Sequence, residues 1–600
     1  MKNILFTLLI STVVVGCSTA HIAPKENTTS IIPVVYQYDL KADEGQEVNG
    51  LSHDLDDYIN QNIESLIKLD IELVSSSETG EVLLKTAYGL LLSLGADSGK
   101  IIVSKLEESN GRSGYDLVEY KATRYNNVPR VLGLVHPRAY SSLAKCIHDN
   151  WGELKCVTEN ENSIIKPEFH QSEKRLVVMN YEEPFVKISR SHTSSFAKRF
   201  RVHTDIANCF NSIYSHSIAW AAVGVKEAKA QQKSKEWFNR LDTYQRKTKR
   251  NETQGIPIGS AASSIVSELI LGKVDEFLIS KNYEFHRYID DYTCYCVTSE
   301  DAQNFIQDLA SSLAIFKLTL NLKKTSIIEL PAAFEDEWVL DLKSALPSRL
   351  GNAGENEPKI SADEALTFLN KAIGINKSTP DGSVLKYATS LIINYLDENA
   401  NISLLEALLN LAWHYPVLLP LFDKLLEKAE INAGVFEQQL NVIIQENADK
   451  FRSDGMSWPL HTMLINNVIP KKETAEKVIA SGDCVAITLL LEMHDFNAMI
   501  VEFANTIIAS DDNYEKDSYW LLLYQLYLKD LLIDEPYTDK VFSCLKKHKV
   551  NFIPRNTKTK AEINCDKIQS EMTSNALKTV FSEMTILAVN KNPDEDSAVF

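Results

Sequence analysis

The feature that most constrains this 600-residue chain is a pair of adjacent acids, Asp290 and Asp291, between two short runs rich in aromatic and β-branched residues over 285–296. That composition predicts strand, tight turn, strand. Neighbouring side chains on a strand point to opposite faces, so the turn is what brings both carboxylates near one site. Two adjacent acids repel and are costly to desolvate, which a divalent cation between them relieves. The plain alternative is a solvated hairpin turn.

Three further motifs accompany this pair in order along the chain. Asp205 stands in an apolar-polar run at 203–210, a Gln-Gly loop rich in Gly and Pro spans 253–260, and Asn-Leu-Lys-Lys-Thr occupies 321–325. Together with Tyr-Ile-Asp-Asp, these motifs resemble the palm motifs of reverse transcriptases. The longer sequence segments at 205–218 and 254–259 resemble those of the abortive-infection, defence-associated bacterial reverse transcriptases. The resemblance is strong over about residues 110–345.

The resemblance implies a metal-dependent nucleotidyl transfer. Asp205, Asp290 and Asp291, with the backbone carbonyl of Ile206, are the expected ligands of two Mg²⁺ ions, and Mn²⁺ is the alternative ion. Mg²⁺ prefers oxygen ligands and keeps positions open for water and substrate phosphates. In such sites one ion activates the attacking hydroxyl and the other stabilises the pyrophosphate leaving group.

The nucleotide site is expected from the same resemblance. Phe210, five positions after Asp205, would lie beneath the sugar and reject a 2′-hydroxyl, and its alternative role is a core aromatic. Gln254 and Gly255 begin the loop that approaches the template nucleotide, since glycine permits close backbone approach. Asn-Asn-Val-Pro at 126–129 predicts a turn between two strands, flanked by Arg124 and Arg130. These arginines are the candidates for holding the triphosphate, because guanidinium forks onto phosphate oxygens; the alternative is ordinary surface arginine.

The proton donor and the primer are left open by the sequence. Lys324 is the candidate general acid for pyrophosphate, and Lys323 is the alternative. Members of the family can begin DNA on a protein hydroxyl, and some extend it without a copied template. Candidate primer tyrosines in the second half of the chain are Tyr514, Tyr519, Tyr524, Tyr527 and Tyr537, for each of which core packing is the alternative.

Charge is unevenly distributed in a way that fits a nucleic-acid partner. The whole chain has a net charge of −19, yet residues 121–250 hold 23 Lys and Arg against 12 Asp and Glu. A basic region inside an acidic chain is typical of a protein that binds the phosphates of a nucleic acid through that region. Expected partners are deoxynucleoside triphosphates, the DNA product, and a non-coding RNA template or a partner defence protein, with homo- or hetero-oligomers left open.

The N-terminus conflicts with a cytoplasmic polymerase. A short basic start and an apolar run lead to Cys17, which resembles the lipidated cysteine of a bacterial lipoprotein signal; the run is too short to span a membrane. Nucleotides and Mg²⁺ are cytosolic, and nine cysteines without a metal-site or disulfide spacing favour a reducing compartment. The cytoplasm is therefore the expected location, and membrane anchoring is the alternative if Cys17 is lipidated.

The expected fold is an α/β (α+β) palm and fingers followed by an all-α, HEAT-like helical repeat domain. Apolar periodicity becomes almost wholly helical after residue 362, with turn signals between the segments. The expected parts are a signal-like segment at 1–20, a linker and helical fingers segment at 21–110, the fingers and palm at 111–345, a linker at 346–362, the helical repeats at 363–590 and a flexible tail at 591–600.

Three hypotheses about function follow. The first is an RNA-directed DNA polymerase in antiphage defence. The second is a reverse-transcriptase-like scaffold without turnover. The third is a membrane-anchored lipoprotein whose helical repeats bind a partner.

Overall fold

The structure is a computed structural model that describes residues 114–553, except 125–127, 166, 170–176, 180–183, 334–335, 348–349, 351–358, 379–382, 511, 539 and 548–551. All described residues belong to one of two compact units, residues 50–600. Several predictions lie outside the described residues: the signal-like segment with Cys17, the helical segment within 21–110, the last part of the helical repeats over 554–590 and the tail at 591–600.

Strands and helices alternate in the first part of the described chain. In order they are β1 (Leu117–Thr123), β2 (Pro129–Val135), α6 (Pro137–Asp149), α7 (Trp151–Leu154), α8 (Cys156–Glu159), β3 (Pro167–Phe169), β4 (Val177–Met179), α9 (Pro184–Ser195), β5 (Phe200–Asp205), α10 (Cys209–Ser212), α11 (Ser217–Val223), α12 (Val225–Ala230), α13 (Trp237–Lys247), α14 (Ala261–Ser280), β6 (Phe285–Tyr288), β7 (Asp291–Cys296), α15 (Ser299–Ile315), β8 (Ser326–Glu329) and α16 (Glu337–Ser344).

The rest of the described chain is helical. In order the helices are α17 (Ala362–Asn376), α18 (Ser383–Ile392), α19 (Glu398–His414), the 3₁₀ turn η3 (Pro416–Leu418), α20 (Leu419–Ala429), the 3₁₀ turn η4 (Ala433–Phe436), α21 (Glu437–Asp449), α22 (Ser453–Ile465), α23 (Lys472–Ser481), α24 (Cys484–Glu492), α25 (Asn497–Ala509), α26 (Asn513–Ser518), α27 (Trp520–Leu528) and α28 (Val541–Lys547).

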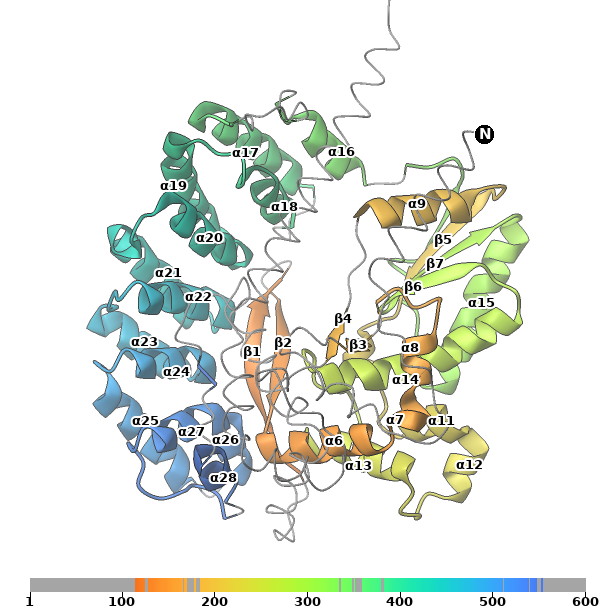
Figure 1. Cartoon of the computed structure of the whole chain (residues 1–600), viewed down its shortest axis with the longest axis horizontal. Helices are drawn as coiled ribbons and strands as arrows, with labels where there is room; N and C mark the ends of the chain where they lie inside the picture. Colours follow the sequence, from red (N-terminus) through yellow and green to blue (C-terminus); the bar gives the residue numbers. More distant parts are fainter. Residues whose placement is uncertain are drawn as a thin grey trace, which may run out of the picture. The chain divides into compact units, whose positions relative to one another are not determined.

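A four-stranded antiparallel sheet in the order β6-β7-β5-β8 carries the acidic motifs. Alternation along β5 buries Val202 and Thr204, as expected for a strand with one face on the core. Helix α15 packs against β5 and β7, and α14 packs against α15 (Figure 1). The two helices start at side-chain caps, Ser260 for α14 and a Thr298–Asp301 capping box for α15, which satisfy amide groups that a helix start leaves unpaired.

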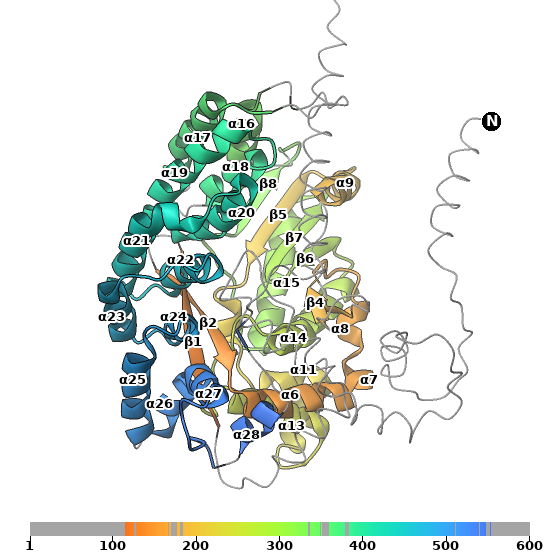
Figure 2. The same cartoon turned by 60° about the vertical axis from the view of Figure 1, so that its left-hand side comes forward.

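The two strands predicted on either side of 126–129 are present: β1 and β2 pair antiparallel with Thr123 opposite Pro129, and residues 125–127 lie outside the described residues. The helical half covers the outer edge of this hairpin. The amides of Lys121 and Thr123 donate to Ser453 Oγ (2.7 Å) and Asp454 Oδ2 (2.8 Å) at the start of α22. Figures 1 and 2 both show β1 beside α22 and α24. An exposed edge strand offers unpaired backbone groups, so these contacts close the hairpin to further strand pairing.

Each C-terminal helix packs mainly on its near neighbours in the chain. Helix α17 contacts α18 and α19, α21 contacts α22 and α23, and α24 contacts α25 and α27 (Figure 1). Helix α26 ends at Ser518 and helix α27 begins at Trp520, with Tyr519 between them. The HEAT-like character of this array and the predicted domain boundaries stay predictions. None of the helices in the described part of the chain combines the length and the apolar character that a membrane span requires.

Substitution of Asp454 tests how strongly the helical half of the chain stabilises the β1–β2 hairpin. Its carboxylate accepts from the Thr123 amide, from Thr123 Oγ1 (2.8 Å) and from the Gly455 amide (2.9 Å). Burial raises the pKa of this carboxyl, which partly offsets the gain from those bonds. We expect Asp454→Asn to lower the free energy of unfolding by about 1–3 kcal/mol, since one buried acceptor is lost. Urea unfolding measures this change.

Asp449 provides the matched control on the preceding helix. Its side chain is 58% exposed and pairs with Lys477, and exposed ion pairs contribute little. Asp449→Asn is expected to change the free energy of unfolding by less than about 0.5 kcal/mol. Equal effects of the two substitutions would contradict the role given to Asp454.

Candidate active site

The acidic pair lies at a two-residue turn. Tyr288 on β6 pairs with Asp291 on β7, so Ile289 and Asp290 form the turn between them. Ile289 has a φ of 56°, which β-branched residues rarely adopt and which costs about 1–3 kcal/mol. The local sequence alone therefore does not favour this turn, and the surrounding structure must stabilise it.

The sheet register brings a third carboxylate to the same end. Asp205 is the last residue of β5 and stands opposite Asp291. The amide of Ile206 donates to the carbonyl of Asp290 at 3.2 Å, which joins the end of β5 to the turn. The three aspartates predicted to share a site are thus gathered from two chain segments, with Ile206 buried beside them.

The carboxylates are held close enough to disturb one another. Burial first, and then the charges of Asp291 and Asp205, raise the pKa of Asp290 to about 6. Burial and Asp205 also raise the pKa of Asp291, against the lowering effects of His203, Lys324 and others. A like charge nearby disfavours ionisation, and such perturbed groups are typical of functional sites.

Lys324 is the cation placed on this cluster. Its ammonium donates to Asp205 Oδ2, and this hydrogen bond is the main cause that raises the pKa of Lys324. Thr325 Oγ1 and Thr204 Oγ1 lie 2.7 Å apart beside it, which ties the lysine loop to β5. Lys323, the alternative proton donor, lies exposed in the same turn.

The chemistry of the donor set fits a divalent cation. The site offers carboxylate oxygens, which Mg²⁺ and Mn²⁺ prefer, and their mutual repulsion is what a cation would relieve. Within the described ranges, no group of three or more His, Cys, Asp or Glu side chains is arranged to hold a metal ion. Asp205 is ion-paired with Lys324. The lysine ammonium therefore neutralises part of the negative charge that a bound metal ion would neutralise.

The Gln-Gly loop lies against the segment that follows Asp205. Gln254 Nε2 donates to the carbonyls of Asn211 (3.2 Å) and Ser212 (3.1 Å), and the amide of Ile256 donates to the carbonyl of Phe210 (2.9 Å). Gly255 has a φ of 80°, and a Cβ there would lie 3.1 Å from the carbonyl oxygen of Asn211. Only glycine fits this position without strain. Half-buried Phe210 is thereby bonded to the loop through its backbone carbonyl, and it packs against the hydrophobic core.

The two candidate arginines lie at the turn end of the hairpin. Arg124 follows β1 and is exposed, and Arg130 is the second residue of β2. The hairpin is joined to the Gln-Gly loop through the amide of Gly133, which donates to the carbonyl of Ile258 at 3.1 Å. Neither arginine is a main cause of the raised pKa of Asp290 or Asp291. Their role in binding a triphosphate stays a prediction.

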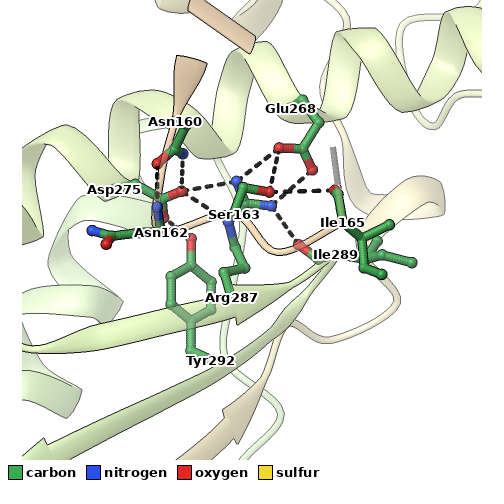
Figure 3. A network of polar contacts seen from close by, with 9 residues as sticks. All are labelled: Asn160, Asn162, Ser163, Ile165, Glu268, Asp275, Arg287, Ile289 and Tyr292. Carbon is green, nitrogen blue, oxygen red and sulfur yellow. Dashed lines mark hydrogen bonds and ion pairs between the residues drawn. The ribbon is translucent and has the colours of Figure 1, made fainter. Parts of the chain in front are cut away.

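Sequence reasoning missed the groups that surround the turn. Lys187 and Arg190 on α9 lie over the Tyr288 ring, at 5.6 and 5.7 Å from its centroid. Arg287 is fully buried and pairs with Glu268 and Asp275 (Figure 3). The available signal was an arginine in a strand with aromatic residues at both ends, together with two acids seven residues apart on one face of a helix.

One family comparison identifies the domain. Residues 154–360 match the family described as reverse transcriptase (RNA-dependent DNA polymerase). The match includes the four-stranded sheet, α14 and all three aspartates. The chain therefore contains a reverse transcriptase domain over about a third of its length. No curated protein matches the chain in sequence.

Solved structures show only loose likeness. Apo telomerase from Candida tropicalis is 11% identical over 66% of this chain and 73% of that chain, with a TM-score of 0.27. Its form truncated from the C-terminal domain is 12% identical over 38% of this chain and 52% of that chain, with a TM-score of 0.26. A chain of an "RdRp complex" is 10% identical over 92% of this chain and 52% of that chain, with a TM-score of 0.30. The chain thus spans about half the length of the latter two.

The raised pKa of Asp290 predicts a pH-dependent gain in stability for Asp290→Asn in metal-free protein. The folded pKa of about 6 exceeds the ordinary value of 3.8, so the folded state binds the extra proton between these pH values. Stability contributed by the protonated form is then lost as pH rises through 6. We expect Asp290→Asn to be more stable than wild type by about 3 kcal/mol at pH 7.5, which is about two pKa units at about 1.4 kcal/mol each, and nearly equal in stability at pH 4.

Urea unfolding in EDTA at the two pH values measures this difference. Asp495→Asn is the control, because Asp495 is an exposed aspartate in the helical half. It should give no pH-dependent difference from wild type. A gain for Asp290→Asn that is the same at both pH values would contradict the carboxylate repulsion described above.

Proposed function

We propose that the reverse transcriptase domain of this chain is an active RNA-directed DNA polymerase that serves in defence against phage. The observation that carries the polymerase part is the convergence of Asp205, Asp290 and Asp291 at one end of the sheet, inside the region that matches the reverse transcriptase family. The defence part rests on the sequence resemblance at 205–218 and 254–259 to abortive-infection enzymes.

Each part of the site has a role in this proposal. Asp205, Asp290, Asp291 and the Ile206 carbonyl would hold the metal ions. When bound, two divalent ions supply activation of the attacking hydroxyl and charge stabilisation of the pyrophosphate. The exposed guanidinium of Arg124 and its neighbour on the hairpin would bind the triphosphate, as forked donors do. The Gln254–Gly255 loop would receive the template base beside Phe210.

Lys324 takes a double role in the proposal. It is paired with Asp205, and its raised pKa keeps it protonated. If Asp205 held a divalent cation, the Lys324 ammonium would no longer be needed to neutralise this carboxylate. Its side chain is 63% exposed, so it is free to turn toward the pyrophosphate and donate a proton there. Lys323 remains the alternative donor.

The primer is a separate question. The Tyr524 side chain is fully buried and Tyr537 is nearly so. The hydroxyls of Tyr519, Tyr527 and Tyr537 bond to Gly482 O, Ser543 Oγ and Asp517 Oδ1. Core packing explains these side chains, which leaves Tyr514 as the candidate among the five for protein priming. The template is proposed to be a non-coding RNA, with a partner defence protein as the alternative aid, in the cytoplasm.

The scaffold hypothesis has one observation in its favour. The Asp205–Lys324 ion pair satisfies one carboxylate within the protein itself, as a domain that no longer binds metal would require. Direct metal binding and nucleotide incorporation separate the two hypotheses. The lipoprotein hypothesis depends on Cys17 alone, and fractionation of cells followed by mass spectrometry of the N-terminus tests it.

Asp290→Asn tests the polymerase proposal directly. Mutation of a group that hydrogen-bonds to a metal ligand typically lowers metal affinity or activity by roughly 10–100-fold. Loss of a ligand itself should have a larger effect, so we expect incorporation of labelled deoxynucleotides to fall at least about a hundredfold. Protection against phage should fall with it. Asp495→Asn serves again as the control and should retain incorporation. Protection that survives in Asp290→Asn would contradict an enzymatic role in defence.

Phe210→Ala tests sugar selection. Removing the ring would make room for a 2′-hydroxyl, so the ratio of kcat/KM for ribonucleotides to that for deoxynucleotides should rise by about tenfold or more. Phe210→Tyr keeps the ring and should leave the ratio near that of wild type. An unchanged ratio in Phe210→Ala would assign Phe210 to core packing only.

A further inference from the structure

Arg287 is the buried centre of a polar network directly beneath the acidic turn (Figure 3). Its Nη1 and Nη2 donate to the two carboxylate oxygens of Glu268, at 2.8 and 2.9 Å. Its Nε and Nη2 donate to Asp275 Oδ2, at 2.9 and 2.8 Å. Glu268 and Asp275 both belong to α14, so this one guanidinium joins the β6–β7 hairpin to that helix.

The remaining acceptors of the network are also occupied. Asp275 accepts from Tyr292 Oη (2.9 Å) and Asn160 Nδ2 (2.6 Å), and Glu268 accepts from Ser163 Oγ (2.9 Å). Burial by itself would lower the pKa of Arg287, but the two carboxylates raise it well above its usual value. A buried ion cluster is tolerated only when each charge is paired and hydrogen-bonded, and this cluster meets that condition.

One bond of this network leaves the cluster and reaches the turn. Arg287 Nη1 also donates to the carbonyl of Ile289 at 2.8 Å. Ile289 has the left-handed φ of 56° and directly precedes Asp290. A β-branched residue persists in that conformation only where its surroundings over-determine it. The hydrogen bond from Arg287 holds the Ile289 carbonyl from the buried side of the turn.

We propose that Arg287 is a positioning residue, which holds the strained Ile289 peptide and so sets the position of Asp290 relative to Asp205 and Asp291, the carboxylates proposed above to bind a divalent cation. Helix α14 supplies the anchors, with Glu268 and Asp275 two turns apart on one face. Arginine suits this place because its planar fork serves two carboxylates and a carbonyl at once, and lysine offers a single charged nitrogen.

The inference rests on the proposed function, because it concerns the same carboxylates. It adds that the geometry of the acidic turn is set by a group that touches neither metal nor substrate. A merely structural arginine would change stability alone. A positioning arginine would also change metal affinity, and the two are separated by a variant that weakens the network without touching the turn.

The test compares Arg287→Lys with Tyr292→Phe. Tyr292→Phe removes one hydrogen bond to Asp275 and leaves the bond to Ile289 in place. Binding of Mn²⁺ alone is measured by electron paramagnetic resonance of the free ion, beside Tm and steady-state nucleotide incorporation. We expect Arg287→Lys to weaken Mn²⁺ binding about 10–100-fold, as for groups that orient metal ligands, and kcat to fall with it. Tyr292→Phe should change Mn²⁺ affinity by less than about twofold.

Two results would overturn the inference. The first is that Arg287→Lys binds Mn²⁺ with wild-type affinity. The second is that the loss of Mn²⁺ affinity is in the same proportion to the loss of Tm in both variants. If Arg287→Lys does not fold, Glu268→Gln replaces it, since it weakens one anchor of the guanidinium, and the same comparison applies. Hydrogen exchange of the 289–292 amides in metal-free protein separates this inference from the proposed function. Faster exchange in Arg287→Lys than in Tyr292→Phe would support positioning even if wild type incorporated nothing, and equal exchange would count against it.

Discussion

Repulsion among three carboxylates at the end of one sheet is the constraint on which the rest of this site depends. Asp205, Asp290 and Asp291 are brought together by the pairing of β5 with β7 and by a two-residue turn. Burial first, and then the charges of neighbouring carboxylates, raise the pKa of Asp290 and Asp291, so ionising these groups lowers the stability of the folded chain. Stability is commonly given up at sites where charge must be concentrated for chemistry.

Two different devices hold this unfavourable arrangement. On the solvent side, the ammonium of Lys324, whose side chain is 63% exposed, neutralises Asp205. On the buried side, the Arg287 guanidinium is locked by Glu268 and Asp275 and supports the peptide of Ile289. The first device suits a charge that is exchanged during a reaction. The second suits geometry that must not change, because a buried pair is costly to break.

The helical half takes part in the architecture of the domain that precedes it. Ser453 and Asp454 accept from the outer amides of β1, and Trp520 Nε1 donates to the carbonyl of Leu134 on β2 at 3.2 Å. Residues more than 300 positions apart thereby share one set of hydrogen bonds. Any movement of the α22 start would be transmitted to the hairpin that carries Arg124 and Arg130, because an edge strand held at two amides cannot shift without losing both bonds.

The sequence by itself determined the two strands on either side of Asp290 and Asp291, the paired strands β1 and β2, the need for glycine at 255 and the almost wholly helical second half. These follow from local patterns: alternation, turn residues and helical periodicity act over a few residues. Only the tertiary structure decided the rest. It placed Lys324 rather than Lys323 on Asp205, and it joined Arg287 to Glu268 and Asp275. Partners of this kind depend on strand register and on how separate elements pack, which no local pattern encodes.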